Sequence, residues 1–128
     1  MPFVDIIYSE SQHSLENARK VGGIVHAALQ EHFNVSAKVL FQQLHPVKTE
    51  YMIMDDSYMA EGTRTEKVMV IKITCVKGRT DEQKKKLYAA IASNAAKACG
   101  ISDADVFILV NETERSAWSF ANGKAPLI

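Results

Sequence analysis

The stretch VMVIKITCVKGRTDEQ, residues 68–83, decides the fold. Its first nine residues, Val68–Val76, are mostly apolar and rich in β-branched side chains, which is typical of a strand buried on both faces. Thr80–Gln83 then has the form of a capping box, in which the first and last side chains bond to each other's backbone at a helix start. The stretch therefore predicts a strand that leads directly into a helix.

The residues that follow continue this pattern. A stripe of apolar and small side chains predicts a helix from about Asp81 to Cys99. Gly100 is well suited to end that helix, because glycine adopts the left-handed backbone of a C-terminal cap without strain. Asp105–Asn111 is apolar on both sides between its two end residues and is expected to be the return strand. The second half of the chain thus reads as one β-α-β unit.

The first half of the chain has the same order of elements. We expect a strand at Phe3–Tyr8, a helix at Leu15–Phe33 and a return strand at Lys38–Leu44. Each half thus reads strand, helix, strand, although the identity between the two halves is low.

Two landmarks relate the halves by one offset. Ser14 and Thr80 each open a predicted helix, and Asn34–Ser36 resembles Gly100–Ser102; both pairs lie 66 residues apart. The sequence therefore predicts a single domain, residues 1–128, with internal repeats at about 2–45 and 68–111.

The connecting segments are less regular. Pro46–Lys67 is a polar linker in which Tyr51–Met54 is expected to form a short extra strand. The tail, Glu112–Ile128, is expected to fold back as a small hairpin around Asn122-Gly123, a favoured turn dipeptide.

Two β-α-β units that share one sheet predict an α/β (α+β) fold with a four-stranded mixed sheet. Right-handed crossovers then place both helices on the same face and leave the other face bare. The predicted strands are nevertheless apolar on the bare side, where Val70, Val76, Phe107 and Leu109 fall. Because the chain has no spare layer, we expect a second subunit to cover this face.

Composition excludes several classes of function. The chain has 15 Lys and Arg against 15 Asp and Glu, so it lacks the basic excess typical of nucleic-acid binding. Its longest apolar stretch is interrupted by Lys72 and falls far short of the ~20 residues that span a bilayer. No secretory signal is visible, and Cys75 and Cys99 have no metal-ligand spacing. We expect a cytoplasmic protein without a metal or membrane contact.

Pro2 is the first residue that could carry chemistry. Aminopeptidases usually remove Met1 before a small second residue, and the mature chain would then begin with a secondary amine. An α-amino group titrates near ~7.7, low enough for a general base or nucleophile at neutral pH. Many proteins begin with Met-Pro for no catalytic reason, and with Met1 retained the Pro2 nitrogen is acylated. In this chain, however, a strand begins directly afterwards and would hold the amine in place.

The loop Lys77–Arg79 is the second candidate. If the first strands of the two units lie side by side and antiparallel, the start of one adjoins the end of the other, and Pro2 faces this loop. Two cations beside a helix N-terminus suit a carboxylate, although a solvated surface loop is the simpler alternative. Trp118-Ser119-Phe120 would give an apolar wall or a subunit contact.

Together these residues resemble the tautomerase superfamily. The resemblance rests on Pro2 at the start of a strand, on the helix entry Gly78–Lys84, and on the tail run Trp118–Ala125. Gly100-Ile101-Ser102 followed by Asp105-Val106 strengthens it. The tail is similar to the branch that contains malonate semialdehyde decarboxylase.

The resemblance implies a homotrimer that uses Pro2 for proton transfer, without a cofactor, on a small oxo-carboxylic acid. Arg79 falls on a carboxylate-binding position, and Lys77 stands where the decarboxylase has arginine. Val39 stands where the decarboxylase has an aspartate tied to decarboxylation and hydration, which favours keto–enol tautomerisation. The apolar wall of the site is expected to include Trp118, Phe120 and Leu127. Alternatives are a malonate semialdehyde decarboxylase or hydratase, and a non-catalytic trimeric binding protein.

Overall fold

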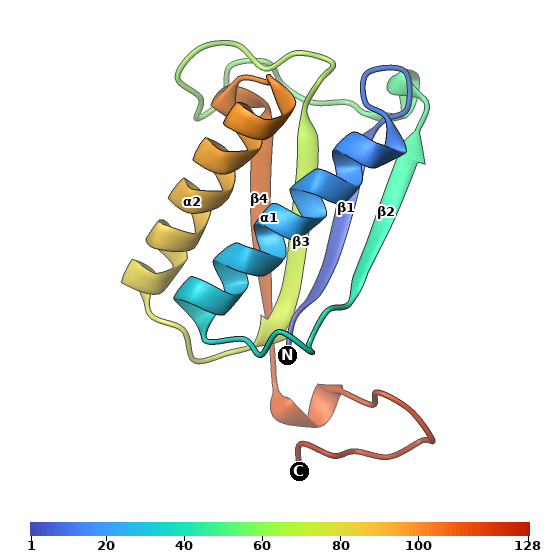
Figure 1. Cartoon of the computed structure of the whole chain (residues 1–128), viewed down its shortest axis with the longest axis vertical. Helices are drawn as coiled ribbons and strands as arrows, with labels where there is room; N and C mark the ends of the chain where they lie inside the picture. The colour runs from blue at the N-terminus through green and yellow to red at the C-terminus, as the bar shows by residue number, and fades with distance from the viewer.

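The computed structural model of residues 1–128 contains a four-stranded mixed sheet with both helices on one of its faces (Figure 1). The strand order is β2-β1-β3-β4, with an antiparallel central pair and parallel outer pairs. This arrangement is the predicted fold class. The elements are β1 (Phe3–Ser9), α1 (Leu15–Phe33), β2 (Gln42–Val47), β3 (Met69–Val76), α2 (Asp81–Cys99) and β4 (Val106–Thr113).

Side-chain and backbone caps fix the ends of both helices where the sequence predicted them. The Ser14 hydroxyl accepts a hydrogen bond from the Asn17 amide at 3.1 Å, and Thr80 and Gln83 form the complete capping box. Asn34 and Gly100 end the helices with left-handed backbones, φ 54° and 65°. The helices begin 66 residues apart, at positions 15 and 81. Neither is long and apolar enough to span a membrane.

The core lies between the sheet and the helices. Alternation along β3 points Met69, Ile71, Ile73 and Cys75 into it, and each of these side chains is at most 1% exposed. The opposite face of the sheet has no helix on it. Large apolar side chains remain exposed there, including Phe107 at 39% and Leu109 at 45%.

The outer strands differ from their predicted ranges. The return strand expected at Lys38–Leu44 lies instead at Gln42–Val47, because a turn follows α1: the Val39 amide donates to the Ser36 carbonyl at 3.0 Å. Pro46 is tolerated because β2 is an edge strand, where a missing N–H costs no ladder bond. The last strand runs on to Thr113, two residues beyond the predicted end at Asn111.

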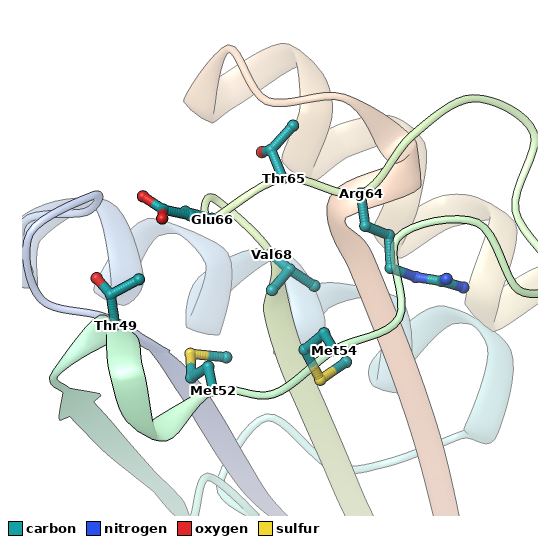
Figure 2. Close-up of a pocket in the computed structure, with 7 residues that line it drawn as sticks. All are labelled: Thr49, Met52, Met54, Arg64, Thr65, Glu66 and Val68. Atoms are coloured by element: carbon teal, nitrogen blue, oxygen red, sulfur yellow. The ribbon is translucent and has the colours of Figure 1, made fainter.

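The linker forms no extra strand at Tyr51–Met54. A short 3-10 helix occupies Thr49–Tyr51 instead, and the following residues find no strand to pair with. Met52 and Met54 lie beside Val68 at the start of β3, where they line a small hollow (Figure 2). Val68 is consequently only 2% exposed, although it points to the open face.

The predicted tail hairpin is reduced to its turn. Asn122 and Gly123 both have left-handed backbones, φ 62° and 65°, and the Lys124 amide donates to the Ala121 carbonyl at 3.2 Å. No strand flanks this turn, because the tail side chains bond back to the end of the sheet. The tail therefore lies beyond that end, near the N-terminus (Figure 1).

Candidate active site

The start of β1 lies beside the end of β3. In the antiparallel register Phe3 is opposite Thr74, which brings Pro2 to the level of Cys75 and close to the Lys77–Arg79 loop. Pro2 is buried, whereas Met1 is 39% exposed. The same end of the molecule holds the end of α1 and the start of α2 (Figure 1). The adjacency follows from the strand order that the sequence predicted.

The terminal amine at this end has an altered acidity. Burial, followed by the positive charge of Arg79, lowers the pKa of the Met1 ammonium below its ordinary value. Cys75 acts in the opposite direction, and Arg115 adds a smaller lowering effect. Two guanidinium groups therefore bear on the amine, and both favour its neutral, basic form.

Arg79 is held in place by backbone carbonyls. Its Nη1 donates to the Val76 carbonyl at 2.9 Å, and its Nη2 donates to the Phe33 carbonyl at 3.1 Å. The guanidinium also lies 5.1 Å from the centroid of the Phe33 ring. Gly78, just before it, has φ 129°, which a residue with a side chain rarely adopts. The remaining N–H groups of Arg79 are free to meet an anion.

Lys77 is placed differently from Arg79. Its Nζ donates to a carboxylate oxygen of Glu114 at 2.6 Å, and both side chains are well exposed. Only its backbone is fixed, by a hydrogen bond of 2.9 Å from the Lys77 amide to the Thr113 carbonyl. The structure thus separates the two predicted cations into an anchored arginine and a solvated, paired lysine.

A second ion pair connects α2 to β4 next to the Lys77–Arg79 loop. Lys84 on α2 donates to Glu112 on β4 at 2.8 Å. The hydrogen bond from Lys84 is the main cause that lowers the pKa of Glu112, and the Gly78 amide acts in the same direction. The pKa of Lys84 is raised in return by the same hydrogen bond. Glu112 therefore ties the start of α2 and the Gly78 turn to the end of β4.

The tail forms an aromatic wall across this end of the sheet. The Trp118 indole stacks on Phe120, with ring centroids 5.5 Å apart and planes inclined by 18°. The Phe120 ring centroid in turn lies 6.2 Å from that of Phe41, which comes just before β2. The Phe41 carbonyl accepts a hydrogen bond from the Val4 amide. The stacked rings therefore extend from the tail after β4 to Phe41, which is bonded to the start of β1.

One hydrogen bond holds this wall to the sheet, and a second closes the tail on itself. The Trp118 Nε1 donates to the Thr113 hydroxyl at 2.7 Å, and the Arg115 Nε donates to the Leu127 carbonyl at 3.0 Å. Leu127 is half-buried as a result. Sequence analysis missed Thr113 and Arg115: the predicted strand ended before the first, and no motif includes the second.

Val39 takes no part in this polar arrangement. It lies in the turn after α1 and packs against the hydrophobic core. A valine there offers neither a proton nor a hydrogen bond to a ligand.

None of the hollows of the single chain is lined by Pro2, Arg79 or the aromatic side chains of the tail. The one in Figure 2 is at the far end of β3, lined by Thr49, Met52, Met54, Arg64, Thr65, Glu66 and Val68. Arg64 is committed there to the linker, donating to the carbonyls of Asp55 and Tyr58.

Comparisons with known proteins agree with this geometry. Residues 40–121, more than half of the chain, match the family described as tautomerase enzyme. The chain is 34% identical over 128 residues to the probable tautomerase YusQ of Bacillus subtilis (strain 168), covering 100% of this chain and 99% of that protein. It is 29% identical to the probable tautomerase YrdN of the same organism, covering 97% and 92%.

A solved structure gives the same result. The FG41 malonate semialdehyde decarboxylase, in a crystal structure of its form inhibited by 3-bromopropiolate, superposes with a TM-score of 0.87. The two share 31% sequence identity, with 96% of this chain and 92% of that chain covered. The chain therefore belongs to the tautomerase family of enzymes.

Proposed function

We propose that the chain catalyses keto–enol tautomerisation of a small oxo-carboxylic acid, without a cofactor, and that Pro2 moves the proton once Met1 has been removed. Arg79 binds the substrate carboxylate, Lys77 lies at the rim, and Trp118, Phe120 and Leu127 contact the apolar part of the substrate.

The juxtaposition of Pro2 with an oriented guanidinium carries this proposal. Pro2 is buried at the level of Cys75, and Arg79 is fixed by two backbone carbonyls at the same sheet end. A charge held in place before the substrate arrives costs little reorganisation when it binds a carboxylate. An amine at Pro2 would lie among the groups that already lower the pKa of the terminal ammonium.

The proton balance of the proposed reaction is simple. The neutral amine of Pro2 takes a proton from the enol form of the substrate, and the resulting ammonium returns it to carbon to give the ketone. No atom is gained or lost. Arg79 stabilises the negative charge that the deprotonated intermediate adds to the carboxylate end.

We propose that three copies of the chain form the working enzyme. The open face of the sheet exposes Phe107 and Leu109, and a second copy would cover them as a helix layer would. No hollow of the single chain is lined by Pro2, and neighbouring copies would help to enclose the site.

Decarboxylation or hydration of malonate semialdehyde is the second candidate. It is favoured by the 0.87 TM-score to the decarboxylase at 31% identity. Val39 packs against the core and supplies no polar group, which ranks this reaction below tautomerisation.

The test begins with mass spectrometry of the intact protein, which establishes whether Met1 is absent. Ultraviolet absorbance then follows ketonisation of an enol-pyruvate and of a 2-hydroxymuconate-like dienol, and malonate semialdehyde is assayed separately. We expect enol substrates to be converted and Pro2→Ala to lose about 10²–10⁴-fold in turnover, the usual worth of a general base.

Pro46→Ala is the matched control, because Pro46 is on edge strand β2 and away from the site. It should retain wild-type turnover. Equal rates for Pro2→Ala and the wild type would remove Pro2 from the mechanism. Turnover of malonate semialdehyde alone would favour the second candidate.

A further inference from the structure

Thr113, the last residue of β4, bonds to three separate parts of the candidate site. Its hydroxyl lies 2.7 Å from the Trp118 indole nitrogen and 3.3 Å from the Cys75 carbonyl, and its own carbonyl accepts from the Lys77 amide at 2.9 Å. One residue thus touches the aromatic wall, the strand beside Pro2 and the cationic loop.

We infer that Thr113 is a positioning residue, which holds Trp118 at the angle that shapes the substrate site at Pro2. The inference rests on the proposed function for its kinetic consequence. The anchoring of Trp118 itself can be measured without any substrate.

The direction of each hydrogen bond is fixed by chemistry. An indole N–H only donates and a carbonyl oxygen only accepts, so the Thr113 hydroxyl accepts from Trp118 and donates to Cys75. The hydroxyl is therefore locked in one rotation by partners on both sides. Its two partners belong to the tail and to the end of β3, beside Pro2.

The position of the Trp118 indole affects the positions of the two rings that follow it in the aromatic stack. Trp118 lies nearly parallel to Phe120, and Phe120 contacts Phe41, whose carbonyl holds the Val4 amide at 3.0 Å. A tilt of the first ring would displace Phe120 and change the shape of the proposed substrate site. Without the Thr113 hydroxyl, the indole N–H has no partner that fixes its orientation.

Fluorescence tests the anchor directly, because Trp118 is the only tryptophan of the chain. Thr113→Val keeps the shape and β-branching and removes both hydroxyl bonds, whereas Thr113→Ser keeps both bonds. We expect red-shifted emission and stronger acrylamide quenching in Thr113→Val, and values close to wild type in Thr113→Ser.

Thr49→Val is the matched control. Thr49→Val also removes two side-chain hydrogen bonds, to Ser9 and Ser11, but Thr49 lies at the opposite end of the sheet. It should lower stability without moving the Trp118 emission or the kinetics. Equal changes in Thr49→Val and Thr113→Val would mean a general loss of stability and would overturn the inference.

Kinetics test the positioning role. We expect Thr113→Val to lower kcat/KM roughly three- to tenfold, the usual worth of one hydrogen bond. The loss should fall on KM rather than kcat, because an apolar wall contacts substrate and transition state alike. Thr113→Ser should restore most of it.

A double-mutant cycle with Trp118→Phe completes the test, and it also serves if Thr113→Val alone folds poorly. Phenylalanine keeps a ring to stack but has no N–H, so adding Thr113→Val to it should change KM little further. Fully additive losses would show that Thr113 does not act through Trp118. A wild type that converts no substrate would reject the proposed function, and the fluorescence comparison would still accept or reject the anchor.

Discussion

Arg79 makes two contacts with Phe33: its Nη2 donates to the Phe33 carbonyl at 3.1 Å, and its guanidinium carbon lies 5.1 Å from the centroid of the Phe33 ring. Phe33 is the last residue of α1, where unpaired carbonyls concentrate negative potential. A cation is therefore stabilised at this position before any ligand arrives. The contact also connects the end of α1 to the loop that opens α2.

The anchoring of Arg79 predicts that it matters more than Lys77. Arg79→Ala removes a part-buried, oriented charge, a loss of ~2–5 kcal/mol in transition-state binding, whereas Lys77→Ala removes an exposed one worth ~0–1 kcal/mol. We expect kcat/KM on a carboxylate substrate to fall far more in Arg79→Ala. Steady-state kinetics of the two variants measure this difference.

The methyl ester of the same substrate is the control, because it carries no charge for either residue to bind. Both variants should convert it at nearly the wild-type rate. Greater damage from Lys77→Ala, or equal sensitivity of acid and ester, would mean that Arg79 is not the carboxylate anchor.

The acidity of the terminal amine predicts a pH dependence. Arg79 and Arg115 both lower the pKa of the Met1 ammonium. An amine at Pro2, exposed by removal of Met1, would lie near the same two cations, so removing either cation should raise the pKa of that amine. A general base is active when neutral, and the acidic limb of the kcat/KM profile should therefore move to higher pH. The shift should be larger in Arg79→Ala than in Arg115→Ala. Profiles that move to lower pH, or do not move, would contradict this assignment.

The open face of the sheet predicts assembly that depends on its apolar side chains. Leu109→Asp places a charge in the middle of this face and should dissociate the proposed homotrimer, which sedimentation velocity would detect as a monomer. Leu15→Asp is the matched control, since Leu15 is 58% exposed at the start of α1, where an acidic residue is favourable. A wild type that sediments as a monomer at micromolar concentration would refute the trimer.

The Lys84–Glu112 pair predicts part of the acid sensitivity of the fold. The pKa of Glu112 is lowered in the folded chain, so its contribution to the free energy of unfolding is present above the ordinary carboxyl range and is lost as pH falls through the lowered value. Glu112→Gln should be less stable than wild type near neutral pH, and the difference should shrink on acidification. Urea titrations at several pH values measure it.

Glu114→Gln serves as the comparison, because Glu114 is paired with exposed Lys77. Exposed pairs contribute little, and this variant should remain close to wild type at every pH. A Glu112→Gln curve parallel to the wild-type curve would exclude the ion pair as a source of acid sensitivity.

The helices could be predicted closely because their signals are local. Ser14, Thr80 and Gly100 act within one turn of the helix ends they specify, and the observed helix ends agree with the prediction. The ends of the outer strands could not be predicted as well. Where β2 begins depends on the turn at Ser36 and on the partner strand, and both are set by packing rather than by neighbouring residues.

The candidate site, too, could be predicted from the sequence only in part. That Pro2 would lie near the Lys77–Arg79 loop followed from strand order alone. The different surroundings of Lys77 and Arg79 did not, because they depend on Glu114 and on the Phe33 carbonyl. The role of Thr113 depends on a tail whose path no periodic pattern describes.

The 66-residue relation between the halves has a consequence for the chemistry. Moving Pro2 by 66 positions gives Val68, at the start of β3 and beside the hollow of Figure 2. Its nitrogen is an internal amide that donates to the Thr65 carbonyl at 3.2 Å, and Met52 and Met54 lie against its side chain. A strand start in mid-chain has no amine to release, so the architecture occurs twice in each chain and the proposed reaction centre only once. Three such chains would have six related strand starts, two in each chain, but only three reaction centres.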